Sequence, residues 1–209
     1  MGFLKAIFGP SKEEIWSQVA DQIKGDFIDG GFWGKDKLVY EHGEWELVLD
    51  TYTESSSNSN GSSSSTDYTR MRAPFLNKDD LNLNIYREGF FSPLGKALGF
   101  QDIVIGDRYF DEEFIIKGNS ETQIKSLLND DRIKKLLRWQ PKVNIKIQSD
   151  NSWFFKKYPE GVNELYFSCV GIMKTPEDLR NLFELFCLIL DRLVKIDSAY
   201  ADDPNVSVD

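Results

Sequence analysis

Residues 175–195, TPEDLRNLFELFCLILDRLVK, predict a long helix that forms the core together with a sheet. Thr175 followed by Pro176 is typical of a helix start, because the proline ring fixes φ at a helical value and its missing N–H is not needed there. Two carboxylates then complement the positive end of the helix dipole. We expect this helix to end near Lys195. Its middle, residues 185–190, is apolar on every side, so the helix is either buried in its own fold, which we favour, or partly covered by the second subunit of a homodimer.

Apolar side chains alternate with polar ones in several segments before this helix. A period of two is typical of half-buried antiparallel strands, whose successive side chains point to opposite faces. The alternation is found at residues 45–49, 81–85, 143–147 and 165–169, and residues 114–117, Phe-Ile-Ile-Lys, also predict a strand. His42 and Gly43 stand between two such runs, so we expect a hairpin turn there rather than a catalytic histidine.

Two further segments carry the signature of a helix start. Ser11 and Ser120 are each followed three residues later by a glutamate or glutamine, which is the capping-box pattern. Apolar residues follow at helical spacing, as they also do at residues 133–137. Because helices and strands are segregated along the chain, we expect the α+β class. The expected architecture is an antiparallel sheet or sheets with an N-terminal helix, two short middle helices and a long C-terminal helix packed against the sheet.

Length and composition fit one folded domain. With 209 residues and 41% apolar content, one sizeable core is expected. Residues 54–66, ESSSNSNGSSSST, predict a long flexible hairpin loop. The expected parts of the chain are a short N-terminal segment at residues 1–10, a single α+β domain at residues 11–197 with sub-lobes 11–100 and 101–197, and an acidic tail at residues 198–209 that frays.

Charge and composition argue against several classes of protein. The formal net charge of −9 argues against binding duplex nucleic acid. The single histidine, His42, gives little basis for histidine catalysis or a zinc site, and we expect no cofactor. Two cysteines, Cys169 and Cys187, cannot form a disulfide framework, which is typical of a reducing compartment. With no recognisable membrane-spanning run or signal peptide, we expect a soluble cytoplasmic protein without membrane contact.

Residues 105–119, IGDRYFDEEFIIKGN, contain a G-D-x-x-F-D-x-x-F stretch that begins at Gly106. Together with the strand and the leucine-ended helix that follow it, this stretch resembles an uncharacterised bacterial domain family of unknown function. The resemblance covers about the second half of the chain. It implies a bacterial protein, cytoplasmic or close to a membrane, and it implies no activity.

The same stretch contains the best candidates for metal binding or acid–base chemistry. On an extended segment, Asp107, Asp111 and Glu113 share the face opposite Phe110 and Phe114. Three carboxylates suit Mg²⁺ or Ca²⁺, or a hydrolytic reaction. Their spacing matches no calcium-binding loop, and a polar surface over buried aromatic rings explains the pattern without a ligand. A carboxylate-dependent hydrolase is therefore the least favoured function, and we lean against an enzyme.

Basic residues are concentrated in one part of the chain. Residues 132–157 contain eight basic residues and one acidic residue, with aromatic residues interleaved. Such a segment suits phosphates or another acidic partner, and the alternative is an ordinary solvated surface that pairs with the acidic remainder. The predicted contact surface consists of Arg132, Lys135, Arg138, Lys142, Lys146, Lys156 and Lys157.

We therefore favour a non-enzymatic binding or interaction module that presents this basic, aromatic-rich surface to a protein or another anionic partner. The alternative is an acidic immunity- or inhibitor-type protein that masks a basic partner with its negative remainder, because complementary charge accelerates encounter.

Overall fold

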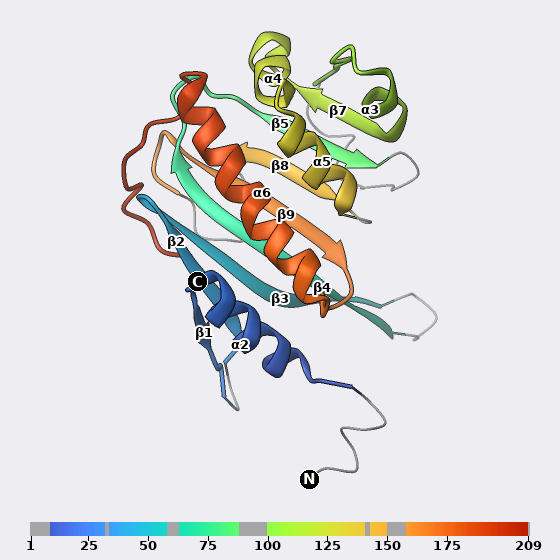
Figure 1. Ribbon diagram of the computed structural model, residues 1–209, viewed down its shortest axis with the longest axis vertical. Coiled ribbons are helices and arrows are strands. Elements are labelled where there is room, and N and C mark those ends of the chain that lie inside the picture. The colour runs from blue at the N-terminus through green and yellow to red at the C-terminus, as the bar shows by residue number, and fades with distance from the viewer. Residues whose placement is uncertain are drawn as a thin grey trace.

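The computed structural model describes residues 9–31, 34–57, 63–87, 100–140, 143–149 and 158–208. In these ranges the chain forms one nine-stranded sheet in which every neighbouring pair of strands is antiparallel. Helices lie over one face of the sheet (Figure 1). This confirms the expected α+β class, with a long C-terminal helix packed on an antiparallel sheet.

The strand order is β1-β2-β3-β4-β9-β8-β5-β7-β6. Strand β5 lies between β8 and β7, so strands from the two halves of the chain alternate in one continuous sheet. The expected sub-lobes 11–100 and 101–197 are therefore not separate units. The strands are β1 Asp26–Ile28, β2 Lys37–His42, β3 Trp45–Ser57, β4 Ser63–Leu76, β5 Leu83–Arg87, β6 Gln101–Asp102, β7 Phe114–Gly118, β8 Asn144–Ser149 and β9 Val162–Val170.

The β3–β4 hairpin extends into the serine-rich segment. Its register continues to the pair Ser57 and Ser63, so most of residues 54–66 belongs to strands rather than to the expected loop. Cross-strand polar contacts account for the difference: the Thr53 hydroxyl donates to Asp67 at 2.7 Å, and the hydroxyl oxygens of Ser56 and Ser64 lie 2.8 Å apart. Residues 58–62 lie outside the described ranges.

Helix α6, Pro176–Lys195, lies along the sheet and is the centre of the core (Figure 1). Leu182, Leu185 and Phe186 are fully buried in it, whereas Cys187 and Leu188 are only partly buried. Its apolar sides are covered by the sheet and by neighbouring helices, in agreement with the expectation that the helix is buried in its own fold. A homodimer formed through this helix stays a prediction. The other helices are α2 Lys12–Ile23, α3 Arg108–Glu113, α4 Glu121–Leu128 and α5 Asp131–Trp139.

The helix starts follow the sequence signals in part. Ser11 accepts from the backbone N–H of Glu14, and the Glu14 side chain accepts from the N–H of Ser11, which completes the capping box. Ser120 likewise accepts from Gln123. Thr175 occupies the N-cap of α6, but its side chain makes no capping hydrogen bond.

The chain after α6 packs against the sheet instead of fraying. Ala199 forms an isolated β-bridge with Asn77, and the N–H of Tyr200 donates to the carbonyl of Leu76 at 3.0 Å. Further along, Val208 is buried and its carbonyl accepts from the Lys37 ammonium group at 3.3 Å. Backbone pairing and apolar burial explain this docking, which the acidic composition did not indicate.

Candidate binding site on the sheet

The two faces of the central sheet differ in chemistry because side chains alternate along each strand. On β4, Met71, Ala73 and Phe75 point toward the helices and are fully buried. Arg70 and Arg72 point to the opposite face. The register pairs Arg72 with Tyr166 on β9, Tyr166 with Lys146 on β8, and Lys146 with Asn84 on β5. A polar row therefore crosses four strands on the face opposite the helices.

We refer to six residues on this face as the sheet-face cluster. They are Asp50, Arg70, Arg72, Lys146, Glu164 and Tyr166. Three of them are cationic and two are carboxylates. Asp50, Lys146 and Glu164 are buried with 1%, 8% and 7% exposure, and Arg70, Arg72 and Tyr166 are half-buried. Charged residues are rarely buried to this extent unless they are paired, so this cluster is the most unusual feature of the described chain.

The Asp50 carboxylate accepts hydrogen bonds from both arginines of the cluster. Arg70 bonds to Asp50 through Nε at 2.8 Å and Nη2 at 2.5 Å, and Arg72 Nη2 lies 2.9 Å from Oδ2 of the same carboxylate. Two-point contacts of this kind are the stronger class of ion pair. Two guanidinium groups therefore contact the same carboxylate.

Tyrosine rings surround the arginines. The rings of Tyr52 and Tyr68 stack with their centroids 4.9 Å apart, and the Arg70 guanidinium lies 5.1 Å from the centroid of Tyr52. Burial, together with the nearby Tyr166, raises the pKa of the Tyr52 hydroxyl. These tyrosines therefore stay neutral and present ring faces and hydroxyl groups beside a positive charge.

Lys146 is the cation of the cluster without a carboxylate partner in the described part of the chain. Its Nζ lies 5.9 Å from the ring centroid of Tyr166, and burial lowers the pKa of the ammonium group. The nearest carboxylate in the register is Glu164, one diagonal step away on β9, whose Oε1 accepts from the Tyr158 hydroxyl at 3.0 Å. A buried lysine without an ion pair favours a negatively charged ligand.

The structure divides the predicted basic surface between two layers. Lys146 lies on the sheet, whereas Arg132, Lys135 and Arg138 lie on α5 in the helical layer. Arg132 pairs with Glu184, and Arg138 Nε lies 2.9 Å from Glu113 Oε2. Lys135 is exposed. The predicted residues Lys142, Lys156 and Lys157 lie outside the described ranges.

Sequence reasoning missed Asp50, Arg70 and Arg72. A signal was present, because Arg70 and Arg72 alternate with Met71 and Ala73 at a period of two. That alternation places both arginines on one face, but it does not show that Asp50, twenty residues earlier in the chain, lies opposite Arg70.

The extended arrangement predicted for the three carboxylates of residues 107–113 is wrong. These residues form α3, with Asp107 as its N-cap accepting from the N–H of Phe110 at 3.2 Å. Asp111 accepts from the N–H groups of Ile105 and Gly106, both at 2.9 Å, and Glu113 faces Arg138. Each carboxylate has its own structural partner. Among the described residues no group of three histidine, cysteine, aspartate or glutamate side chains is arranged to hold a metal ion.

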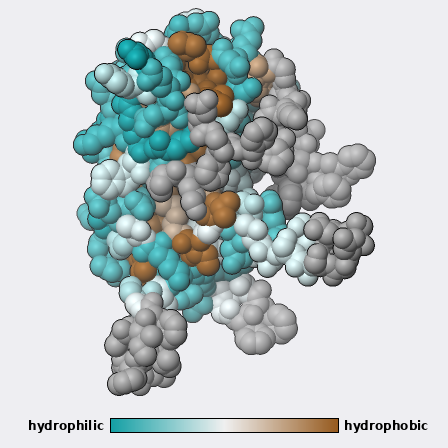
Figure 2. All heavy atoms as spheres, turned by 90° about the vertical axis from the view of Figure 1, so that its right-hand side faces the viewer, coloured by the Kyte–Doolittle hydropathy of each residue, from teal (hydrophilic) through white to brown (hydrophobic). Residues whose placement is uncertain are grey.

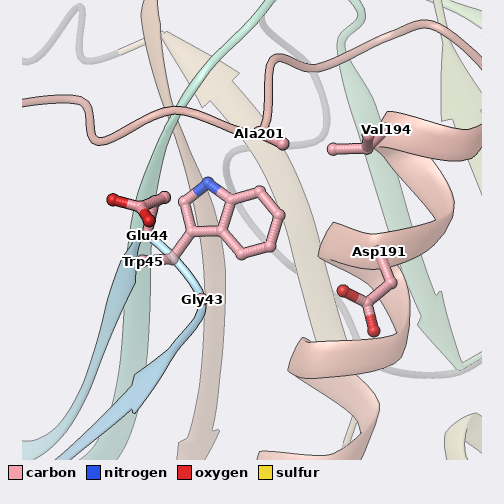
Figure 3. A pocket seen from close by; sticks show the side chains of 6 residues that line it. All are labelled: Gly43, Glu44, Trp45, Asp191, Val194 and Ala201. Carbon is pink, nitrogen blue, oxygen red and sulfur yellow. The ribbon is translucent and has the colours of Figure 1, made fainter.

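A separate recess of about 290 Å³ lies between the β2–β3 turn, the last part of α6 and the segment after it. Figure 3 shows the indole of Trp45 on one side, and the side chains of Asp191 and Val194 pointing toward it from α6. Glu44 adds a second carboxylate to the lining, and Asp191 Oδ1 lies 2.9 Å from His42 Nε2. An aromatic ring beside two carboxylates suits a positively charged group.

Figure 2 shows several small groups of apolar residues at the surface of the described chain. A second recess, about 210 Å³, lies at the start of α6 and is lined in part by Phe167, Val170 and Ile172. No helix of the described chain is long and apolar enough to span a bilayer.

The comparisons with known proteins give a fold but no family. No protein-family model matches the chain. No curated protein matches it either. The crystal structure of the mycobacterial trehalose monomycolate transport factor A, TtfA, is similar with a TM-score of 0.51 and 7% sequence identity, over 87% of this chain and 94% of that one. At this identity the similarity shows a shared fold.

Proposed function

We propose that this protein is a non-enzymatic binding module that takes an anionic partner on the sheet face opposite the helices. The observation that carries the proposal is Lys146, a buried cation with no carboxylate partner among the described residues. Burying an uncompensated ammonium group costs free energy, and an anionic ligand would recover it. Residues that lower stability in this way are typical of functional sites.

The neighbouring residues support the same chemistry. Arg70 and Arg72 add two cationic groups to the same face, and the side chain of Arg70 is 20% exposed. Tyr52 and Tyr68 offer hydroxyl groups for hydrogen bonds beside these cations. The fold neighbour is named a transport factor, and by analogy of fold alone this name agrees with a role in binding.

Compensated charge makes the α5 residues weaker candidates for the contact surface. Arg132 and Arg138 already pair with Glu184 and Glu113. Lys134, on the same helix, lies 2.9 Å from Asp107. Exposed Lys135 has no such partner in the described ranges, but it lies on α5 in the helical layer, away from the sheet face, and this position makes it a control for Lys146.

Heparin, a soluble polyanion, provides a direct test. We expect the wild-type chain to be retained on a heparin column and to elute earlier as salt is raised, because the contact is electrostatic. Lys146→Gln should elute at lower salt, and Lys135→Gln at the wild-type position. Wild-type flow-through at low salt, or a loss seen in Lys135→Gln alone, contradicts the proposal.

A second candidate function is an inhibitor-type protein that masks a basic partner. The recess beside Trp45 favours it, because Glu44 and Asp191 line a hollow that contains an aromatic ring (Figure 3). Oligolysine is a suitable probe. Asp191→Asn should weaken its binding, whereas Glu112→Gln, which changes an exposed glutamate on α3, should not. Equal binding by the two variants contradicts this candidate.

A further inference from the structure

We propose that the ligand of the sheet face is a phosphorylated sugar, either free or as the head group of a lipid. This inference rests on the proposed function and specifies its ligand. It is drawn from the hydrogen-bonding groups around Lys146, which require both an anion and hydroxyl donors.

Two asparagine side chains flank Lys146. Asn84 lies directly opposite it on β5, and Asn144 precedes it by two positions on β8, so all three side chains share one face. The Oδ1 atoms of Asn84 and Asn144 are buried, and neither has a hydrogen-bond partner in the described structure. Asn84 itself is 9% exposed. Buried acceptors without donors are rare in folded proteins and cost free energy.

These groups select among ligand classes. An amide oxygen accepts hydrogen bonds and an ammonium group donates them. A simple inorganic anion would satisfy Lys146, but it brings few donors for the two amide oxygens. A neutral sugar would supply hydroxyl donors and leave the lysine charge uncompensated. A phosphorylated sugar supplies both, so it is the class that fits Lys146, Asn84 and Asn144 together.

The same row provides additional contacts. Lys117 on β7 is paired in register with Asn84 and lies 3.1 Å from Asp102, and the half-buried ring of Tyr166 lies on the other side of Lys146. Aromatic rings present apolar faces that suit the C–H surface of a sugar ring, with a hydroxyl group at the edge. The row therefore contains cations, hydrogen-bond acceptors and a ring within a few strand spacings.

Calorimetric titration with three probes tests the inference: glucose 6-phosphate, inorganic phosphate and glucose. We expect glucose 6-phosphate to bind at least about tenfold more tightly than either of the others, which is a difference of about 1.4 kcal/mol. Asn84→Leu should remove the preference for glucose 6-phosphate over phosphate. Because the substitution also removes an unsatisfied acceptor, it should not lower the melting temperature. Lys146→Gln should weaken both phosphate-containing probes, and Lys135→Gln should weaken neither.

Vesicles of phosphatidylcholine with and without phosphatidylinositol separate the two sources of the ligand. Binding only to vesicles that contain the inositol phosphate head group identifies a lipid, and binding to glucose 6-phosphate identifies a free ligand. Equal affinity for phosphate and glucose 6-phosphate, with no binding to the phosphatidylinositol vesicles, overturns the inference. If retention on heparin still depends on Lys146 in that case, the proposed function stands and only the phosphorylated-sugar inference is wrong. If the wild-type chain is not retained on heparin at low salt, the proposed function and the inference are both wrong.

Discussion

Asp50 and Arg70 face each other across β3 and β4, and their side chains are joined by two hydrogen bonds of 2.8 and 2.5 Å. Asp50 is 1% exposed and also accepts from Arg72 at 2.9 Å. One buried carboxylate therefore contacts two guanidinium groups in the middle of the sheet. This arrangement makes Asp50 the residue on which the polar face depends most.

Asp50→Asn should destabilise the fold strongly. The substitution removes the negative charge that both guanidinium groups contact, and removing one partner of a buried ion pair typically costs about 3–5 kcal/mol. Urea unfolding followed by circular dichroism measures the effect. Glu41→Gln, which changes an exposed carboxylate on β2, is the control and should shift the free energy of unfolding by less than about 0.5 kcal/mol. Similar midpoints for the two variants would show that the cluster contributes no stability.

Lys146→Met should raise the stability of the protein at pH 7, while it weakens retention on heparin as Lys146→Gln does. Burial lowers the pKa of Lys146 in the folded chain below the ordinary lysine value of 10.5. Between these two pKa values the unfolded chain binds more protons, so wild-type stability increases as pH rises through this window. Lys146→Met lacks that increase. Melting temperatures measured from pH 7 to pH 10.5 check both points, with Lys135→Met as the control, and a marked destabilisation by Lys146→Met would indicate a structural role.

Asp107→Asn should flatten the loss of stability in acid. The Lys134 ammonium group, at 2.9 Å, and the N–H of Phe110 hold the pKa of Asp107 below its ordinary value of 3.8. The stabilising contribution is therefore complete above that value and is lost as pH falls through the lowered pKa. Thermal unfolding at pH 5 and at pH 2 measures the difference. Asparagine still caps α3, so a variant with the same pH dependence as wild type contradicts this assignment.

Cys187 should react slowly with thiol reagents in the native protein. Burial raises the pKa of its thiol to about 12, and the nearby Asp191 acts in the same direction. The thiolate is the reactive form, so little of it is present at pH 8. A chromogenic disulfide reagent should label neither Cys187 nor buried Cys169 rapidly at pH 8, and it should label both in guanidinium chloride. Fast labelling of Cys187 in the native chain would show that the middle of α6 opens readily.

Local patterns predicted the elements that depend on neighbours in sequence. The capping box at Ser11 and the apolar period of residues 175–195 correctly indicated α2 and α6, because helix hydrogen bonds and caps join residues only three or four positions apart. Period-two alternation likewise indicated β3, β5, β8 and β9. The same kind of evidence failed at residues 107–113, where N-capping by Asp107 stabilises the six-residue helix α3 in place of an extended strand.

The α+β class, the long buried helix and the uneven distribution of charge can therefore be predicted from local sequence patterns. The strand order, the pairing of Arg132 and Arg138 with distant carboxylates, and the burial of Lys146 beside Asn84 and Tyr166 follow only from the folded chain. They depend on antiparallel register, which brings together side chains that are far apart in the sequence. The alternation of apolar and polar residues along β8 is compatible with an exposed or a buried Lys146. Packing of the neighbouring strands determines which of the two occurs.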